Sequence, residues 1–150
     1  MERVGRSDEA SLEYQAAIKL KPRSPKYHYA RAMLLLKTQQ VDEAGAELEQ
    51  VLRLDPENVE AHFAIGNVAF VNNGVEEAER HYLEALRLDP KRADIRSVLG
   101  DIYFQQGRIS QAIVQNEEAL RLNPSLRNTE EHLRLARAGD ARFKSPSPQK

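Results

Sequence analysis

The sequence of 150 residues contains no cysteine and no tryptophan, and only 6% of its residues are aromatic. Without cysteine, disulfide bonds and thiolate chemistry are excluded. No apolar stretch approaches the roughly 20 residues that a membrane-spanning helix requires. The first residues also lack the apolar core of a secretory signal. From these absences we expect a cytoplasmic protein that has no membrane segment.

Neither sign of charge is in excess. The chain has 22 Lys and Arg residues against 23 Asp and Glu residues, which gives a net charge of −1. Such a balance provides no strong attraction to DNA, RNA or an anionic membrane. Apolar residues make up 41% and charged residues 30%, which is ordinary for a soluble domain. We therefore expect neither a nucleic-acid partner nor a membrane partner.

The chain does contain an internal repeat. Four prolines recur at one constant interval, at Pro22, Pro56, Pro90 and Pro124. Each closes a similar phrase, such as Val-Leu-Arg-Leu-Asp-Pro in one copy and Ala-Leu-Arg-Leu-Asp-Pro in the next. At a fixed distance before each proline stands an alanine, at Ala10, Ala44, Ala78 and Ala112. A fixed period in the range of about 20–50 residues predicts a repeat architecture.

The spacing within each period is that of helices. In one copy Ala78, Tyr82, Ala85 and Leu86 fall at i, i+4, i+7 and i+8, which is one apolar stripe of a helix. The apolar residues between positions 63 and 70 indicate a second helix upstream. The proline at the end of each copy cannot continue a helix. The repeated unit is therefore predicted to be helix–turn–helix.

Turn and cap residues mark the ends of these helices. The predicted breaks within the hairpins are Thr38-Gln39-Gln40, Asn72-Asn73-Gly74 and Gln106-Gly107. Ser24 precedes Pro25, and Asn58 precedes Val59, so both residues stand where an N-cap is expected.

A helical hairpin that recurs with this period resembles the tetratricopeptide repeat, whose unit is about 34 residues long. That family's pattern is Trp, Leu-Gly and Tyr, followed by Ala, an aromatic residue, Ala and Pro. The best copy reads His62, Ile65-Gly66, Ala69, Ala78, Tyr82, Ala85 and Pro90. Three departures stand out: the tryptophan is absent, Arg31 replaces an apolar residue, and Asn116 replaces the aromatic residue. The resemblance implies an all-α protein, an α-solenoid of stacked antiparallel helix hairpins with a right-handed superhelical twist.

This resemblance also sets the expected organisation of the chain. The predicted segments are a partial repeat with only its second helix (1–24), three full repeats (25–58, 59–92 and 93–126), a C-terminal capping helix (127–139) and a disordered tail (140–150). A capping box at Asn128-Thr129-Glu130-Glu131 is expected to open the last helix, and Gly139 to end it. In the tail, Ser145 and Ser147 each precede a proline, so they are either phosphorylation sites or part of a plain flexible tail.

A search for chemistry yields no catalytic, cofactor or metal site. His28 and His62 occupy the same repeat position, so their side chains should point in parallel and not converge on a metal. Glu77 and His81 share a helix face, but no further ligand is identifiable, so we interpret them as a solvated pair. The sequence has no glycine-rich phosphate loop, no His-Glu-x-x-His motif and no nucleophile elbow. We therefore expect a protein that is not an enzyme.

The resemblance implies a concave surface lined by the first helix of each hairpin. The residues expected to line this groove are Tyr29, Met33, Leu36, Phe63, Asn67, Phe70, Asp101 and Phe104. Aromatic and methionine side chains beside a few polar groups suit the capture of a peptide. The alternative is that several of them belong to the core between hairpins.

One subclass of the family binds C-terminal carboxylates through a clamp of Lys, Asn and Arg. The matching positions here are Tyr29, Met33, Ala64, Asp94 and Val98, which supply neither the charge nor the amide. The resemblance therefore does not extend to the binding of chaperone tails.

Three functions remain open. The first is an interaction module that holds a protein or peptide partner in the groove. The second is an accessory domain that positions substrate for a larger enzyme, for example a transferase. The third is a homo-oligomer formed through the uncovered face of the N-terminal helix, with Val4, Leu12 and Ile18 as its candidates.

Overall fold

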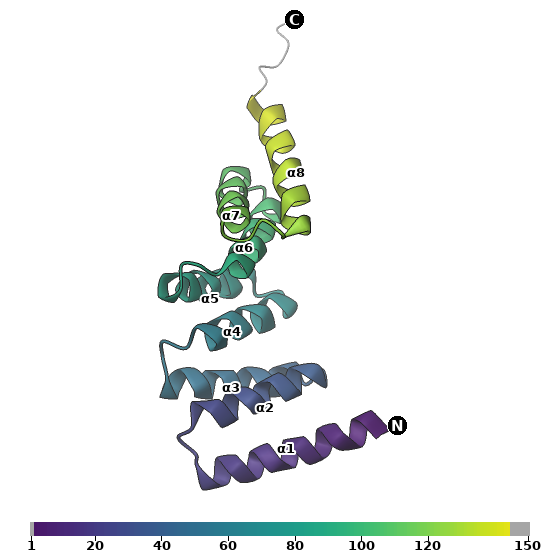
Figure 1. Cartoon of the computed structure of the whole chain (residues 1–150), viewed down its shortest axis with the longest axis vertical. Coiled ribbons are helices and arrows are strands. Elements are labelled where there is room, and N and C mark those ends of the chain that lie inside the picture. The colour runs from purple at the N-terminus through teal and green to yellow at the C-terminus, as the bar shows by residue number, and fades with distance from the viewer. Residues whose placement is uncertain (1, 145–150) are drawn as a thin grey trace, which may run out of the picture. The chain divides into compact units, whose positions relative to one another are not determined.

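The computed structural model describes the backbone of residues 2–144 and the side chains of residues 11–139, and helices are the only regular elements in that range (Figure 1). The helices are α1 (Glu2–Leu20), α2 (Pro25–Lys37), α3 (Val41–Leu54), α4 (Val59–Val71), α5 (Val75–Leu88), α6 (Ala93–Gln105), α7 (Ile109–Leu122) and α8 (Arg127–Lys144). The predicted all-α fold class is confirmed. None of the described helices is both long enough and apolar enough to cross a membrane.

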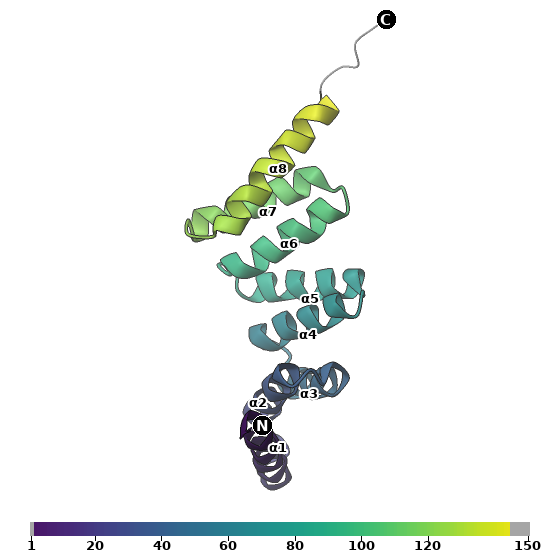
Figure 2. The ribbon, with the colours of Figure 1, turned by 90° about the vertical axis from the view of Figure 1, so that its right-hand side faces the viewer.

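The chain divides into two compact units, residues 1–88 and 89–150. In the first unit, α2 packs against α3 and α4 against α5 as hairpins, while α1 lies against α2 and α3 against α4. In the second unit, α6 and α7 form a hairpin, and α8 packs on both of them (Figure 2).

The turn inside each hairpin uses the same backbone conformation. Gln39, Asn73 and Gly107 have φ angles of 63°, 60° and 72°, and they recur with the period of the repeat. After each of them an N–H donates to a carbonyl five residues earlier, as from Gln40 to Leu35 at 2.9 Å. This is the left-handed ending of a helix, in which glycine is the favoured residue. The three predicted breaks are therefore confirmed.

Of these three residues, Gln39 is the one whose type is disfavoured in the left-handed conformation. Asparagine tolerates it and glycine pays no steric penalty, whereas other residues lose about 1–2 kcal/mol. We expect Gln39→Gly to raise the free energy of unfolding by about 0.5–1 kcal/mol, because glycine's extra chain entropy offsets part of that gain. Urea titration measures the change. The control is Gln40→Gly, where φ is −90° and no gain is expected.

Of the two predicted helix caps, one forms. The side chain of Asn58 accepts a hydrogen bond from the backbone N–H of Ala61 at 3.0 Å. Ser24 stands at the N-cap position of α2, but its side chain makes no capping hydrogen bond.

Helix α8 starts at the first residue of the predicted capping helix (127–139), but Asn128 lies inside it and not at its cap, and the helix ends later than predicted. It begins at Arg127, one residue before the expected cap, and Thr129 is buried with its hydroxyl 2.6 Å from that of Ser97. The hydroxyl therefore bonds to a neighbouring helix and not to its own backbone. The helix also continues past Gly139 to Lys144. A glycine inside a helix costs only about 1 kcal/mol, and Gly139 does not take a positive φ. The predicted tail thus starts too early, and Ser145 and Ser147 lie outside the described residues.

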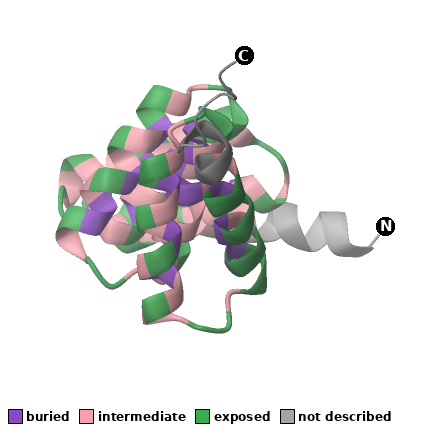
Figure 3. Cartoon of the chain, turned by 90° about the horizontal axis from the view of Figure 1, so that it is seen from above, coloured by how far each residue is buried: buried purple, intermediate pink, exposed green. Residues whose placement is uncertain are grey.

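Buried residues lie on the helix faces that meet other helices within each unit (Figure 3). At one repeat position the residue facing the second helix is small: Ala32, Gly66 and Gly100. The residues at the opposing position are Leu48, Tyr82 and Asn116, and all three are fully buried. A small residue on the first helix therefore leaves the space that the opposing side chain fills.

Candidate functional site

The residues predicted to line the groove fall into both units, so each set is described within its own unit. In the first unit they are Tyr29, Met33 and Leu36 on α2, and Phe63, Asn67 and Phe70 on α4. We call these six the α2–α4 face. Tyr29 and Met33 are partly buried against a core cluster that includes Ala61 and Ala64 of α4. The two helices are thus held together by one core beneath this face.

Phe63 and Asn67 are bound to the hairpin that carries them. The hydroxyl of Tyr82 donates to the side-chain oxygen of Asn67 at 2.8 Å, and the rings of Phe63 and Tyr82 have centroids 5.9 Å apart. Burial raises the pKa of Tyr82 to about 12, so its hydroxyl stays protonated as a donor. Both residues therefore support Tyr82 whether or not they also contact a partner.

The most exposed apolar surface of this face lies at the end of α4. Phe70 is 36% exposed, and its neighbour Val71 is 66% exposed. The sequence analysis did not include Val71, although it stands four residues after Asn67 and so continues the same stripe of α4.

Helix α2 contributes only positive charge. It contains Lys26, Arg31 and Lys37 and no acidic residue. Arg31 is paired with Glu47 of α3, which also faces His28. Lys26 and Lys37 are exposed, eleven residues apart on one side of the helix. They stand at the two ends of the row that holds Tyr29 and Met33.

In the second unit the predicted groove residues are Asp101 and Phe104 of α6. The carboxylate of Asp101 is bound by the imidazole of His132 on α8. Burial raises the pKa of Asp101, and the nearby His132 partly offsets this effect. Phe104 is half-buried. Helix α8 therefore occupies part of the α6 surface that was predicted to receive a partner.

At the position where the family has tryptophan, each repeat has a polar bridge. His28, His62 and Arg96 each contact a proline carbonyl six residues earlier, at distances between 3.0 and 3.2 Å. Each also contacts the side chain 19 residues later on the second helix of its hairpin: Glu47, His81 and Gln115.

The interpretation of Glu77 and His81 as a simple solvated pair is wrong. His81 Nδ1 lies 3.1 Å from His62 Nδ1, and their ring centroids are 5.3 Å apart. The pKa of His81 is lowered, first by burial and then by the adjacent His62. The contact crosses the hairpin, so helix periodicity within one segment could not reveal it. In all three repeats, however, the two residues that form the bridge are polar, and this pattern was available in the sequence.

The exposed face of α1 matches only part of the predicted oligomer surface. Leu12 is 65% exposed, whereas Ile18 is half-buried. Val4 lies outside the residues whose side chains are described. Among the described residues, no group of three or more His, Cys, Asp or Glu side chains is arranged to hold a metal ion.

The repeated hairpin, with its recurring turn and bridge, agrees with a comparison with protein families. The family model described as tetratricopeptide repeat matches residues 2–59, 29–90 and 63–126. The chain belongs to the tetratricopeptide repeat family. Tetratricopeptide proteins are also found among the solved structures that it resembles. No curated protein matches the sequence significantly.

Three solved structures illustrate the shared fold. MamA has a TM-score of 0.84 at 21% identity, with 93% of this chain and 82% of that chain covered. YrrB, described as a TPR protein with an unusual peptide-binding site, has a TM-score of 0.79 at 17% identity, covering 95% and 74%. PilF of Pseudomonas aeruginosa has a TM-score of 0.80 at 23% identity, covering 94% and 64%. At these identities the likeness shows the tetratricopeptide fold alone.

Proposed function

We propose that this tetratricopeptide chain is a non-catalytic scaffold whose α2–α4 face holds an apolar segment of a partner protein. The observation that carries the proposal is the exposed pair Phe70 and Val71, which extends a row of half-buried aromatic and methionine side chains. Apolar side chains that remain accessible beside a packed core mark interaction sites when they are contiguous. Membership of the family and the description of YrrB as peptide-binding support the same function.

The face suits recognition because the core beneath it is already formed. Tyr29 and Met33 rest on buried residues of α3 and α4, and Asn67 is fixed by Tyr82. Side chains that are immobilised before binding lose little conformational entropy when a partner arrives. Aromatic and methionine side chains also supply a large contact area for few rotatable bonds.

The charges of α2 define the chemistry of the partner more closely. Lys26 and Lys37 are separated by eleven residues of helix, which corresponds to about 16 Å. No acidic residue of α2 neutralises them. The partner is therefore a peptide in which acidic residues flank an apolar stretch. These acidic residues would contribute mainly to association rate and orientation, since exposed charge pairs add little affinity.

A defined peptide library tests this proposal with the full chain. Peptides that combine apolar and acidic residues are selected on wild type, and their affinities are measured by fluorescence anisotropy. We expect Phe70→Glu to weaken binding at least about tenfold, or about 1.4 kcal/mol, because it places a charge in an apolar contact. The matched control is Leu83→Glu, which changes a 44% exposed leucine on α5, outside the α2–α4 face. Equal losses in both variants, or no loss in either, would contradict the assignment.

The lysines give a separate prediction. The double variant Lys26→Gln/Lys37→Gln is expected to reduce affinity for acidic peptides about two- to tenfold and to flatten its dependence on salt, because exposed ion pairs are screened. Stopped-flow association rates at several ionic strengths measure this effect. A salt dependence identical to that of wild type would show that the peptide does not contact α2. Phe63 and Asn67 are left unchanged in these tests, since either substitution would disturb Tyr82.

A further inference from the structure

The His62–His81 contact is organised by a backbone carbonyl. His62 Nε2 lies 3.0 Å from the carbonyl oxygen of Pro56. A carbonyl only accepts, so Nε2 must carry the proton and donate it. In neutral His62 the other nitrogen, Nδ1, is then left with a free lone pair directed toward His81. The tautomer of His62 is thus fixed by the turn that precedes α4.

A histidine held in this way resembles a metal ligand before the metal arrives. Histidine ligands of metals regularly donate their second ring N–H to a backbone carbonyl or a carboxylate, which fixes the ring orientation. The two Nδ1 atoms are 3.1 Å apart. Two imidazole nitrogens on one tetrahedral zinc, at about 2.0–2.1 Å each, would be about 3.3–3.4 Å apart. In a chelate both rings would turn so that their Nδ1 lone pairs converge on the metal and no longer point at each other.

The geometry points to a divalent transition-metal site formed by the Nδ1 atoms of His62 and His81, with water in the remaining coordination positions. The ions that fit are those that prefer imidazole nitrogen, namely Cu²⁺, Ni²⁺ and Zn²⁺. Two protein ligands and a half-exposed position make this an open site of moderate affinity. It is not a closed structural site.

Metal binding changes the tautomer of His81 and releases no net proton. Without metal, the Nδ1 proton of neutral His81 is donated to the free Nδ1 of His62. When the metal binds both Nδ1 atoms, that proton moves through solvent to Nε2 of His81. His62 keeps its proton on Nε2 and its hydrogen bond to Pro56.

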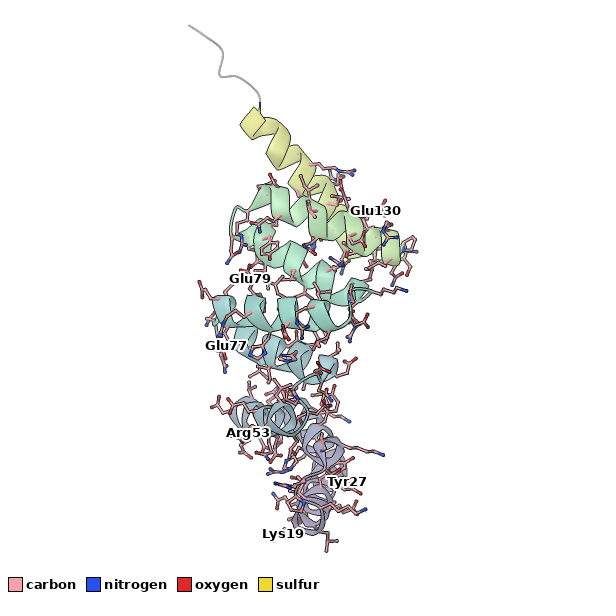
Figure 4. All side chains as sticks on the ribbon, turned by 90° about the vertical axis from the view of Figure 1, so that its left-hand side faces the viewer. Lys19, Tyr27, Arg53, Glu77, Glu79 and Glu130 are labelled. Carbon is pink, nitrogen blue, oxygen red and sulfur yellow. The ribbon has the colours of Figure 1, made fainter. Side chains whose placement is uncertain are left out.

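Two carboxylates and one guanidinium, that of Arg80, act electrostatically on His81. Glu77 lies on α5 one turn before His81 (Figure 4), and Glu49 on α3 also acts electrostatically on His81. Both carboxylates also line a small depression between α3, α4 and α5, which the two histidines do not line. The two carboxylates outnumber Arg80, so the net field near His81 favours a dication over a neutral solvent molecule.

The other repeats provide an internal comparison. His28 faces Glu47, but that carboxylate is already bound by Arg31. Arg96 faces Gln115, and neither side chain is a metal ligand of this kind. The same bridge is therefore built three times, and only the second copy brings two imidazoles together. The remaining histidine of the chain, His132, is paired with Asp101.

The site is tested by titrating tag-free full chain with Zn²⁺ and Ni²⁺ by isothermal titration calorimetry. Wild type is expected to bind one ion saturably, and NMR should show the largest shifts in the imidazole signals of His62 and His81. The decisive variant is His62→Arg/His81→Gln, which reproduces the Arg96–Gln115 bridge of the third repeat and so retains the fold. It is expected to weaken binding at least about tenfold.

His132→Gln is the control and should bind as wild type does. Circular dichroism confirms that each variant is folded before titration. The proposal is overturned if wild type shows no saturable binding up to millimolar metal, or if the double variant binds as tightly as wild type. Glu77→Gln is expected to weaken binding about two- to fivefold through the loss of its field. If Glu77→Gln loses as much metal affinity as the histidine variant does, Glu77 is itself a ligand and the two-ligand site is wrong.

Discussion

Replacing Gly66 with alanine is expected to destabilise the first unit by about 1–3 kcal/mol, although alanine is the better helix former. A Cβ atom at this position would lie 2.5 Å from Cε1 and 2.7 Å from Cδ1 of Tyr82. The ring cannot move away freely, because it is fully buried and its hydroxyl is bonded to Asn67. The helix-propensity gain of about 1 kcal/mol is therefore outweighed by overpacking.

Gly45→Ala is the matched control for this substitution. Gly45 also lies inside a helix, but a Cβ atom there would meet only Cγ1 of Val68, at an ordinary 3.6 Å. This variant is expected to gain up to about 1 kcal/mol. Urea unfolding followed by circular dichroism compares the two alanines, and amide hydrogen exchange reports whether the α4–α5 hairpin opens first. A Gly66→Ala protein as stable as Gly45→Ala would show that Tyr82 does not fix this contact.

The first repeat suggests how the loss can be rescued. There the same two positions are Ala32 and Leu48, which share one buried cluster. The double variant Gly66→Ala/Tyr82→Leu copies that combination into the second repeat. Because the two residues touch, their effects should not add, and the double variant is expected to be more stable than the sum of the single changes by at least about 1 kcal/mol. If the two single changes in the free energy of unfolding simply add, the size of residue 66 does not limit the size of residue 82.

The regular parts of this fold could be predicted because they repeat. The constant period, an apolar stripe at helical spacing and the break residues determine where each hairpin turns. Gly107 even indicates the left-handed position that Gln39 and Asn73 share. Asn58 was identified as a cap because its side chain needs only the first turn of its own helix. Each of these features depends on residues that are close in sequence.

The features that could not be predicted depend on contacts between helices. His81 meets His62 only because two helices are rotated toward each other, and Thr129 bonds to Ser97 only because α8 packs on α6. Whether a tyrosine such as Tyr29 lines a surface or a core is decided in the same way. Its half-buried state within the α2–α4 face shows that these alternatives are not exclusive. The assignment of this face to a partner remains a prediction.

The third repeat buries a side-chain amide without hydrogen-bond partners, and replacing this amide gives the last prediction. Asn116 is fully buried, and neither atom of its amide has a hydrogen-bond partner in the described part of the chain. It lies directly over Gly100, where a Cβ atom would come within 2.0 Å of its side-chain oxygen. A buried polar group without a partner costs about 1–3 kcal/mol. The aromatic residue that the family has at this position would avoid that cost.

Asn116→Leu is therefore expected to raise the free energy of unfolding by about 1–3 kcal/mol. Leucine has the same number of side-chain heavy atoms and the same branch point as asparagine, and its larger methyl groups replace the two unpartnered amide atoms. It is also the residue that the first repeat places at this position, as Leu48. Thermal and urea unfolding of the full chain measure the gain, and the protection of α6 and α7 amides from exchange locates it in the second unit.

Asn67→Leu is the control, because it removes an amide that is hydrogen-bonded, whereas Asn116→Leu removes one that is not. The side-chain oxygen of Asn67 accepts the hydroxyl of Tyr82, so its loss leaves a buried donor and is expected to cost about 1–2 kcal/mol. The same chemical change should thus stabilise the protein in one repeat and destabilise it in another. If Asn116→Leu is destabilising instead, the Asn116 amide is satisfied, for example by a buried water between α6 and α7, and that hairpin has no defect to repair.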